Sequence, residues 1–404
     1  MELKVLKILV VSFYYSPDLS AGSFRTTALV KALLAQLPEN AHVEVVTTLP
    51  NRYSSYTREA PEIEELPRLT IRRIKLPSHQ SGMVDQARVF ATYARQVVAL
   101  ARQGNYQLIF GTSSRLMTAA LCAYIANMKR LPLYLDIRDI FVDTIKDVLS
   151  RKLVLLVKPF FSLVERWSIT RANRVNLVSR GFEDYFTGRY PKQHYSFFTN
   201  GIDEEFISAG EKILRRDRIR KEPMVVLYAG NIGEGQGLHA VIPELAKRLE
   251  GRVQFRLIGD GGRKSLLQRR LAEVGCSNVE LLPPVKRDIL IYEYQKADIL
   301  FLHLNDYSAF KKVLPSKLFE YAAMGKPLWA GVAGYAGEFV RTEIDNSVVF
   351  HPCDVDDAMQ ALSELKLIHC NRTDFIEKYA REKIVRTMAT DVLSIVPKNI
   401  VVNG

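Results

Sequence analysis

The sequence predicts an α/β protein whose parallel strands are connected by crossover helices. Short apolar runs that suit strands buried on both faces alternate with longer segments of helical period along the chain. The alternation forms two series, one on each side of about Gly201. A length of 404 residues is sufficient for two or three domains. We therefore expect two α/β domains in succession.

The first series begins with the buried strand Lys7–Val11, followed by a loop with Pro17 and Gly22. A helix is expected from about Ser23, because apolar residues recur at helical spacing as far as Leu37. The other strands expected in this half are Val43–Val46, Gln107–Phe110, Leu133–Ile137 and Val175–Val178.

The second series begins after Gly201 with an arginine-rich, highly charged segment between Ala209 and Pro223, which we expect to be an exposed connector. A final helical stretch is expected over Phe375–Ile395. The strands expected in this half are Val225–Tyr228, Val253–Ile258, Val279–Leu281, Ile299–Leu304 and Leu328–Trp329.

The composition, 48% hydrophobic and 25% charged, is that of an ordinary globular protein. Four cysteines without metal-site spacing favour a reducing compartment, and the seven histidines are dispersed, so neither a metal nor another cofactor is predicted. We expect no signal peptide. The best apolar candidate for a membrane span, Leu153–Val164, is too short and is interrupted by Lys158 and Pro159.

The net positive charge is concentrated in the first half, because that half has few acidic residues. Residues 1–200 contain 27 Lys and Arg against 16 Asp and Glu, whereas residues 201–404 contain 29 against 28. Such an imbalance indicates an anionic partner for the first domain. Arg88, Arg95 and Arg102 recur every seven residues and would lie along one helix face. Nucleic acid is disfavoured as the partner, because the basic residues are dispersed and no recognised module is present.

A second basic segment combines cations with aromatic residues. Lys152, Lys158 and Arg166 flank an apolar run that includes Phe160 and Trp167. This combination indicates docking on an anionic membrane surface. The alternative is a solvated helix face beside a face that packs on the core.

The segment after the predicted strand Ala297–Leu304 carries the most informative motif. Pro315 and Ser316 suit the start of a helix, where backbone N–H groups lack intrahelical partners, and Lys317 and Glu320 fall in its first turn. An anion-binding helix end, a cation and a carboxylate at the carboxyl edge of a sheet suit a nucleotide diphosphate. The alternative is that Glu320 only complements the helix dipole.

Two glycine-rich turns follow other predicted strands. Leu227–Gly233 runs from a strand into glycines, and Phe255–Lys264 repeats the pattern with a basic helix start. Glycine lets a backbone approach a phosphate closely and exposes its N–H groups. Either turn alone is common in α/β proteins, but both together with the Lys317 helix indicate a phosphate site.

Further short motifs are Ser16-Pro17-Asp18 with Gly22, Asp136-Ile137-Arg138-Asp139, Asn200-Gly201-Ile202-Asp203 and Asn278–Val285. Together with Ala229–Gly233, Gly259–Gly261 and Lys317–Tyr321, they resemble the family 4 retaining glycosyltransferases of the GT-B type over nearly the whole chain. The resemblance is strongest to bacterial O-antigen and capsule sugar transferases, including those assigned to N-acetyl-L-fucosamine.

The resemblance implies two Rossmann-like domains that face a central cleft. It implies an acceptor-binding domain over residues 1–200 and a nucleotide-sugar-binding domain over 201–385. Residues 386–404 would form a helix and tail that pack back on the first domain. It also implies a retaining, metal-independent transfer in which the second domain holds the donor.

The resemblance also implies roles for individual residues. Lys317, Arg263 and Lys264 would contact the diphosphate, assisted by the N–H groups of Gly230 and Asn231. Glu320 would contact the ribose hydroxyls, and the backbone near Val285 the base. The remaining residues expected around the donor are Gly22, Gly259, Asp260, Ser316 and Leu318.

The strand that ends near Asp136 would carry catalytic residues, because functional loops follow such strand ends. Relatives often have a His-Asp pair here, and Arg138 stands where the His would be. Asp139 would orient or deprotonate the acceptor hydroxyl, or alternatively form an ordinary ion pair with Arg138. Ser23 and Arg25 would meet the donor or an acceptor phosphate, or alternatively serve as a helix cap and a surface charge.

Two departures from the family pattern concern charge. Lys312 occupies the position of the first glutamate of the family's glutamate pair, and Asn231 and Gln236 replace the usual phosphate-binding Arg and Lys. We infer that charge neutralisation has moved to Lys311, Lys312 or Lys317. Loss of activity is the alternative. Asp354-Val355-Asp356 has the Asp-x-Asp pattern of metal-dependent transferases, but it precedes a helical run, so acids in the first turn of a helix are the favoured explanation.

The expected function is that of a cytoplasmic, membrane-peripheral glycosyltransferase that extends a lipid-linked glycan from a UDP-sugar. Two alternatives remain open: a UDP-sugar epimerase of the same fold, and a non-catalytic subunit of a glycan-assembly system. A dinucleotide-dependent oxidoreductase is disfavoured, because no Gly-x-Gly-x-x-Gly follows the first strand with an acid at the expected distance.

Overall fold

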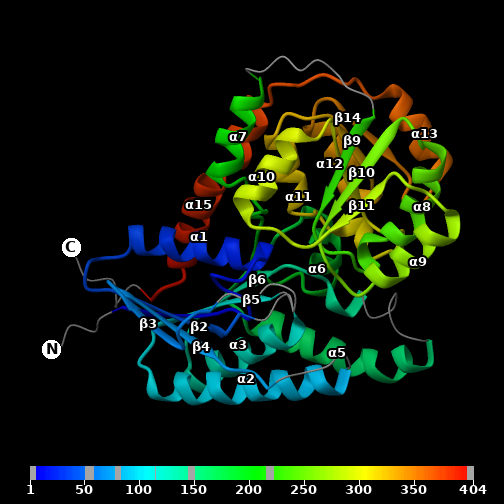
Figure 1. The fold of residues 1–404 in the computed structure, drawn as a ribbon. Helices are drawn as coiled ribbons and strands as arrows, with labels where there is room; N and C mark the ends of the chain where they lie inside the picture. Colours follow the sequence, from blue (N-terminus) through cyan, green and yellow to red (C-terminus); the bar gives the residue numbers. More distant parts are fainter. Residues whose placement is uncertain are drawn as a thin grey trace. The chain divides into compact units, whose positions relative to one another are not determined.

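The computed structural model describes residues 6–50, 59–77, 83–113, 115–143, 151–214 and 223–397 (Figure 1). The chain divides into two compact units. Unit 1 comprises Met1–Thr199 with Glu382–Gly404, and unit 2 comprises Asn200–Arg381. The boundaries between the units thus fall after residues 199 and 381, whereas the sequence predicted boundaries after residues 200 and 385.

Unit 1 is built on an eight-stranded sheet with the strand order β3-β4-β2-β1-β5-β6-β7-β8. All neighbouring strands are parallel except the pair β3 and β4. The strands are β1 (Lys7–Val11), β2 (His42–Thr48), β3 (Ile63–Leu66), β4 (Leu69–Ile74), β5 (Leu108–Ser113), β6 (Leu133–Ile137), β7 (Arg174–Leu177) and β8 (Tyr195–Ser196).

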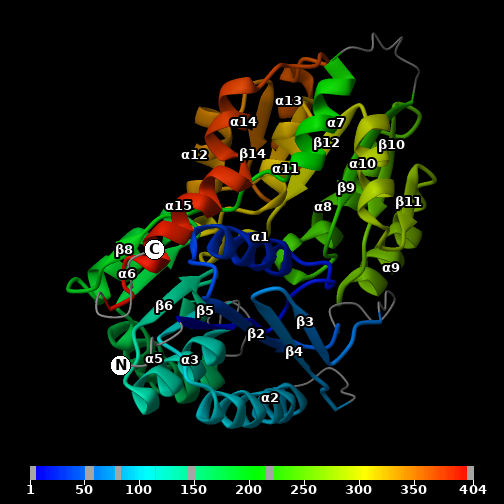
Figure 2. The same cartoon turned by 90° about the vertical axis from the view of Figure 1, so that its left-hand side faces the viewer.

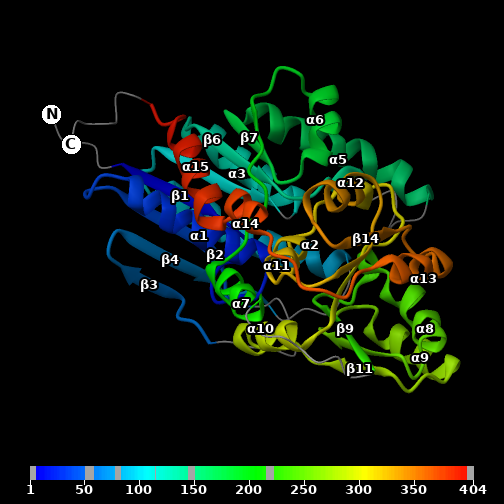
Figure 3. The same cartoon turned by 90° about the horizontal axis from the view of Figure 1, so that it is seen from above.

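Helices cover both faces of this sheet. Figures 1 and 2 show α2, α3 and α5 along one face and α1 along the other. Seen from above, α1 and α15 run beside each other (Figure 3), and the Gln36 side chain bonds the α15 backbone. The helices are α1 (Ala21–Gln36), α2 (Met83–Gln103), α3 (Leu116–Lys129), α5 (Arg151–Arg171), α6 (Glu183–Arg189) and α15 (Arg381–Leu393).

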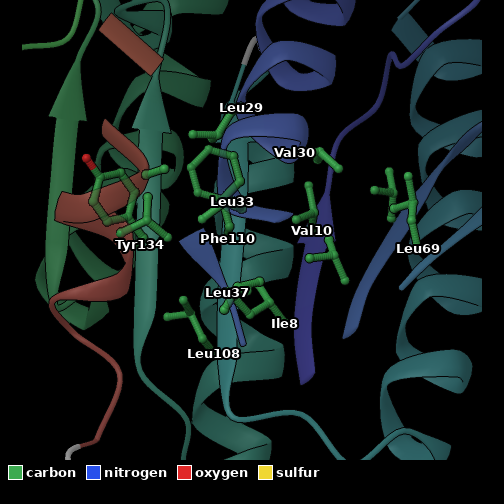
Figure 4. Packing of buried hydrophobic residues seen from close by; sticks show 14 of the residues in the cluster. Ile8, Val10, Leu29, Val30, Leu33, Leu37, Leu69, Leu108, Phe110 and Tyr134 are labelled. Carbon is green, nitrogen blue, oxygen red and sulfur yellow. The ribbon is translucent and has the colours of Figure 1, made fainter. Parts of the chain in front are cut away.

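The core of unit 1 lies between the central strands and α1. Ile8 and Val10, alternate residues of β1, share one buried cluster with Leu29 and Leu33 of α1, as period-two and period-3.6 patterns require (Figure 4). The α15 residues Val385, Met388, Ala389 and Val392 complete this cluster from the far end of the sequence.

Unit 2 contains a six-stranded, fully parallel sheet with the order β11-β10-β9-β12-β13-β14. Because all strands run the same way, all of their carboxyl ends meet at one edge. The strands are β9 (Met224–Ala229), β10 (Val253–Ile258), β11 (Val279–Leu282), β12 (Ile299–His303), β13 (Leu328–Gly331) and β14 (Ser347–Phe350).

Helices α8, α9 and α13 bury their apolar residues against one face of this sheet around Trp329. On the other side, Tyr321 of α11 contacts Tyr294 of α10, which stacks on Phe206 of α7. The helices of unit 2 are α7 (Glu204–Leu214), α8 (Leu238–Arg248), α9 (Lys264–Val274), α10 (Arg287–Lys296), α11 (Lys317–Ala323), α12 (Gly334–Glu343), α13 (Val355–Glu364) and α14 (Thr373–Tyr379).

The structure confirms the α/β class and the parallel sheets, and it corrects several details. Strands β3, β4, β8 and β14 were not expected. The helical stretch expected over Phe375–Ile395 is two helices, separated at Ala380. The expected connector is helical as far as Leu214, and its remainder, residues 215–222, lies outside the described residues. Within the described chain, no helix is long and apolar enough to cross a membrane.

Candidate functional site

The predicted donor residues gather at the carboxyl edge of the unit 2 sheet. Strand register explains why, since Ala229 pairs with Ile258 and the glycines that follow them are therefore adjacent. Gly230 and Gly259 have φ values of 142° and 158°, which side chains rarely adopt. A Cβ on Gly259 would collide with the carbonyl oxygen of Gly230. The two turns thus pack backbone against backbone.

Hydrogen bonds between the two turns occupy several of their backbone N–H groups. The Gly230 N–H donates to the Ile258 carbonyl at 2.8 Å, so our expectation that this N–H binds phosphate is wrong. The Ile232 N–H donates to the Asp260 carbonyl at 2.8 Å, and the Arg263 N–H donates to Ile232 at 2.9 Å. The Asp260 carboxylate accepts from the Gly261 N–H at 2.9 Å, which stabilises its own turn.

The two residues that replace the family's phosphate-binding cations contact each other. The Asn231 amide donates to the Gln236 side-chain oxygen at 2.7 Å. Gln236 also accepts from the Gly233 N–H at 3.3 Å. The pair holds the loop closed but carries no charge, so the loop after β9 does not itself neutralise an anion.

Lys317 supplies a cation at this loop from the start of α11. Its ammonium lies 4.5 Å from the Tyr228 ring centroid and donates to the Tyr228 hydroxyl at 3.1 Å. The hydroxyl donates in turn to the Asn231 carbonyl at 2.6 Å. A Cβ at position 230 would collide with the end of the Lys317 side chain as it lies here. The lysine is thus fixed over the turn by a ring and a hydrogen bond.

The other predicted cations are bound to internal partners. Arg263 forms an ion pair with Glu234 of the 3-10 turn η2 (Glu234–Gln236). Glu234 also accepts from Tyr307 at 2.5 Å, and hydrogen bonds from Tyr307 and Arg263 hold the pKa of Glu234 below its usual value. Lys264 donates to the Gly259 carbonyl at 3.2 Å. Lys311 pairs with Asp306 at 3.0 Å, whereas Lys317 donates to the Tyr228 hydroxyl at the end of β9.

Glu320 lies one helical turn after Lys317. The Tyr294 hydroxyl donates to its carboxylate at 3.3 Å. Burial raises the pKa of Glu320, against the opposing positive charge of Arg287. Arg287 and Arg381 both pair with Asp203, whose pKa they hold below its usual value although burial alone would raise it. Glu320 therefore lies beside the charged cluster of Asp203, Arg287 and Arg381, and is not an isolated acid at a helix start.

A buried histidine stabilises the loop after β9 from the β12 side. His303 Nε2 accepts from the Cys353 N–H at 2.9 Å, so Nδ1 carries the proton and donates to the Gln236 carbonyl at 2.7 Å. Asn305 donates to the carbonyl of Glu234 at 3.0 Å. These contacts fix the position of Gln236. From the sequence, Gln236 was recognised only as a neutral residue in place of a phosphate-binding cation of the family.

The other predicted donor residues occupy less central positions. Ser316 precedes α11 and makes no side-chain cap bond. The Leu318 side chain is fully buried, so only its backbone is available to a ligand. Val285 is half-buried in the loop between β11 and α10.

In unit 1, Arg25 is not the acceptor contact that the sequence suggested. It is 1% exposed and forms a two-bond ion pair with Asp136 at 2.9 and 3.1 Å. It also donates to the carbonyls of Phe198 and Thr199. Burial alone would raise the pKa of Asp136, but Arg25 holds it below its usual value. The pair is a structural element of unit 1.

Ser23 is also buried, and its backbone N–H donates to the Ser20 hydroxyl that caps α1. It is therefore not an acceptor contact in this structure. Gly22 lies in the first turn of α1, and a Cβ there would be 3.9 Å from the Arg138 guanidinium carbon. Arg138 donates to the Ala21 carbonyl at 3.5 Å, and Asp139 is exposed just after β6. These two residues stay candidates for the acceptor side.

The Asp-x-Asp sequence has a structural explanation. Asp354 caps α13 by accepting from the Asp357 N–H at 3.0 Å, and Asp356 pairs with Arg248. Over the part of the chain that the structure describes, no three His, Cys, Asp or Glu side chains are arranged to hold a metal ion.

Sequence reasoning missed Tyr228, His303 and the Asn231–Gln236 pair. A tyrosine at the end of a predicted strand was a weak signal, because strand tyrosines usually pack in the core. The histidine inside an apolar run, Phe301-Leu302-His303-Leu304, was a better signal, since a buried imidazole requires partners.

Known protein families and relatives match the chain over most of its length. The family model described as "Glycosyl transferase 4-like domain" matches residues 25–201, and that described as "Glycosyl transferases group 1" matches residues 210–383. WcaI of Escherichia coli K12, named as a colanic acid biosynthesis glycosyl transferase, is 25% identical over 415 residues. The match covers 96% of this chain and 100% of that protein.

Solved structures share the fold. Sucrose-phosphate synthase from Thermosynechococcus elongatus has a TM-score of 0.66 at 15% identity, with 97% of this chain and 96% of that chain covered. Anabaena HepE in complex with UDP and glucose has a TM-score of 0.67 at 16% identity, with 96% and 99% covered. WaaG, a glycosyltransferase involved in lipopolysaccharide biosynthesis, has a TM-score of 0.63 at 14% identity, with 97% and 98% covered. Because the two family models together span most of its length, the chain belongs to the family 4 glycosyltransferases of the GT-B fold.

Proposed function

We propose that this glycosyltransferase moves a sugar from a UDP-sugar to a lipid-linked oligosaccharide during assembly of a bacterial O antigen or capsule. The name of WcaI supports a role in cell-surface polysaccharide synthesis. The HepE complexes, which contain UDP, UDP and glucose, or UDP-glucose, support a uridine diphosphate donor. The sugar that the sequence resemblance favours is N-acetyl-L-fucosamine.

The observation that carries the proposal is the position of Lys317 over the Gly230 turn. Transfer breaks the bond between the anomeric carbon and the diphosphate, and UDP leaves with the electron pair. A fixed cation beside the departing phosphate stabilises that charge without reorganisation. Asn231 and Gln236 are neutral, so Lys317 is the residue we assign to this role. Its helix has only seven residues, which makes the ammonium more important than the helix dipole.

The other assignments follow from the same edge of the sheet. Glu320 is assigned to the ribose hydroxyls, because its carboxylate is held by Tyr294 and lies one turn from Lys317. The backbone near Val285 is assigned to the base. On the acceptor side, exposed Asp139 is assigned to orienting the acceptor hydroxyl and accepting its proton, with Arg138 beside it. We further propose that the transfer retains anomeric configuration and needs no metal.

The acceptor would be reached at the cytoplasmic membrane. A lipid-linked glycan stays in the bilayer, so the enzyme would work as a peripheral protein on the inner face. The net charge of unit 1 residues and the basic, aromatic helix α5 support this placement.

The test begins with calorimetry of UDP binding to the full chain. We expect Lys317→Met to weaken UDP binding by about tenfold or more, since it removes a charge-assisted contact. The matched control is Lys247→Met, which removes an exposed lysine of α8 that pairs with Glu250. This variant should bind UDP as tightly as the wild type. Unchanged affinity in the Lys317 variant would refute the assignment of this residue.

A screen of UDP-sugars with lipid-linked acceptors, read by mass spectrometry, tests the reaction itself. Asp139→Asn should lower transfer while UDP binding persists. Isomerised sugar from donor alone would identify an epimerase instead. A folded protein that binds no nucleotide and turns over no donor would be a non-catalytic subunit.

A further inference from the structure

Helix α5 has one face that is buried in unit 1 and an opposite, exposed face that is apolar. Glu165, Ser168 and Ile169 are buried against unit 1. Leu155 is 77% exposed and Leu163 is 66% exposed, and Phe160 and Trp167 are also exposed. These residues are spaced three to five positions apart, so they share one helix face.

This face is unusual for the molecule as a whole. Single exposed apolar residues are normal on protein surfaces, but contiguous ones indicate a binding surface. Among the described residues ten large apolar side chains are exposed, and four of them are on α5. A fifth, Tyr124, lies on α3, which packs against α5. Half of the exposed large apolar side chains therefore belong to two neighbouring helices.

The charges around this face have one sign. Arg166 is exposed among the apolar residues, and Lys158 is half-buried on the same helix. The α5 sequence contains a single acid, Glu165, which is buried and accepts hydrogen bonds from Tyr185 and Tyr190. The α5 surface thus presents cations and apolar groups without an exposed carboxylate. The side chain of Lys152, which the sequence also suggested for this surface, lies outside the described residues.

The positive charge continues along the same helix layer. Figures 1 and 2 show α2, α3 and α5 together on one face of the unit 1 sheet. Arg88, Arg95 and Arg102 are exposed along α2, as their seven-residue spacing predicted. The one acid of α2 is Asp85 in its first turn, and α3 contains none. A broad cationic surface therefore flanks the apolar face.

We propose that the exposed face of α5, with Tyr124 and the arginines of α2, docks unit 1 onto an anionic lipid bilayer. Leucine and aromatic side chains would enter the headgroup–acyl boundary while the cations contact lipid phosphates. A protein partner would supply complementary carboxylates but would not need four adjacent apolar groups without acids or amides between them. This inference rests on the proposed lipid-linked acceptor and names the surface by which the enzyme reaches it.

Vesicle flotation with the full chain tests the proposal. We expect binding to vesicles that contain phosphatidylglycerol, weaker binding to phosphatidylcholine alone, and partial loss with added salt. Phe160→Ser with Leu163→Ser should lower partitioning by about tenfold or more, because two inserted side chains are removed. The matched control is Ile289→Ser with Tyr292→Ser, which removes two exposed apolar residues from α10 in unit 2 and should change nothing.

Trp167 provides a direct reading of insertion. The chain has two tryptophans, and Trp329 is buried in the core of unit 2. A blue shift of emission and quenching by brominated lipid should therefore come from Trp167 and disappear in Trp167→Phe. Each variant is checked for folding by circular dichroism and for UDP binding by calorimetry. A failure of membrane docking can then be distinguished from a failure of the proposed donor site.

Several outcomes would overturn the docking proposal. These are no vesicle binding by the wild type, equal binding to neutral vesicles, or equal loss in the α10 control. Burial of Trp167 in a self-associated form without lipid, seen by light scattering, would identify a second copy as the occupant. Vesicle binding without any UDP uptake would sustain the docking surface while refuting the proposed transferase.

Discussion

His303 should make unit 2 lose stability in mild acid. The ring is fully buried, and its neutral form is required because Nε2 accepts from the Cys353 N–H while Nδ1 donates to Gln236. Burial lowers the pKa of His303 from 6.5 to about 4. Between these values the unfolded chain binds a proton that the folded chain excludes, so stability is complete above pH 6.5 and falls as the pH falls toward 4. The loss amounts to about 3 kcal/mol at full extent.

The measurement compares the wild type with His303→Gln, whose amide oxygen can still accept from Cys353 but does not titrate. Both proteins carry Trp167→Phe, so that Trp329 alone reports the unfolding of unit 2 by urea. A reporter in one unit is needed because a chain with two units does not unfold in a single step. The variant is expected to be less stable at pH 7.5, with a smaller loss on acidification.

The difference between the two pH dependences isolates this ring, because His239 and the carboxylates are present in both proteins. By pH 4.5 the wild type should have lost about 2 to 3 kcal/mol more than the variant. Equal losses in the two proteins would show that the imidazole accepts a proton in the folded state. The proposed neutral tautomer would then be wrong.

Three further changes test other contacts. Tyr228→Phe keeps the ring beneath Lys317 but removes the hydroxyl that orients it, so calorimetry should find UDP binding about 3- to 10-fold weaker. Arg25→Met leaves Asp136 buried without its cation and should cost about 3 to 5 kcal/mol in urea unfolding of unit 1, while Arg25→Lys should recover part of this. Glu320→Gln should remove the preference for UDP over 2′,3′-dideoxy-UDP, a discrimination that the wild type should show about tenfold.

Local pattern was sufficient to place most of the proposed donor residues at one edge of the unit 2 sheet. Lys317 and Glu320 were recognised because a helix start after a buried strand places its first turn at the sheet edge. The partner of Lys317 was not recognised, because it depends on how α11 lies beside β9. Two residues 89 positions apart in sequence meet there, and no local spacing encodes their distance.

For Arg25 the error is the opposite one, because the sequence suggested a ligand contact where the structure has an internal ion pair. An arginine at the start of a helix usually extends into solvent, and the sequence around Ser23 contains no sign of the contrary. The structure turns it inward because β6 places Asp136 beside α1 and the carbonyls of Phe198 and Thr199 supply further acceptors. The positive charge of Arg25, which resembled a ligand contact, is thus neutralised by Asp136, 111 residues away in sequence.

The sequence by itself determined the α/β class, the two strand–helix series and the glycine turns, because these depend on periodicity and on residues near one another in the chain. The tertiary structure decided which cations are bound to internal partners and which apolar helix face remains uncovered. Ion pairing and burial are properties of distance in space, and the packing of remote segments sets those distances.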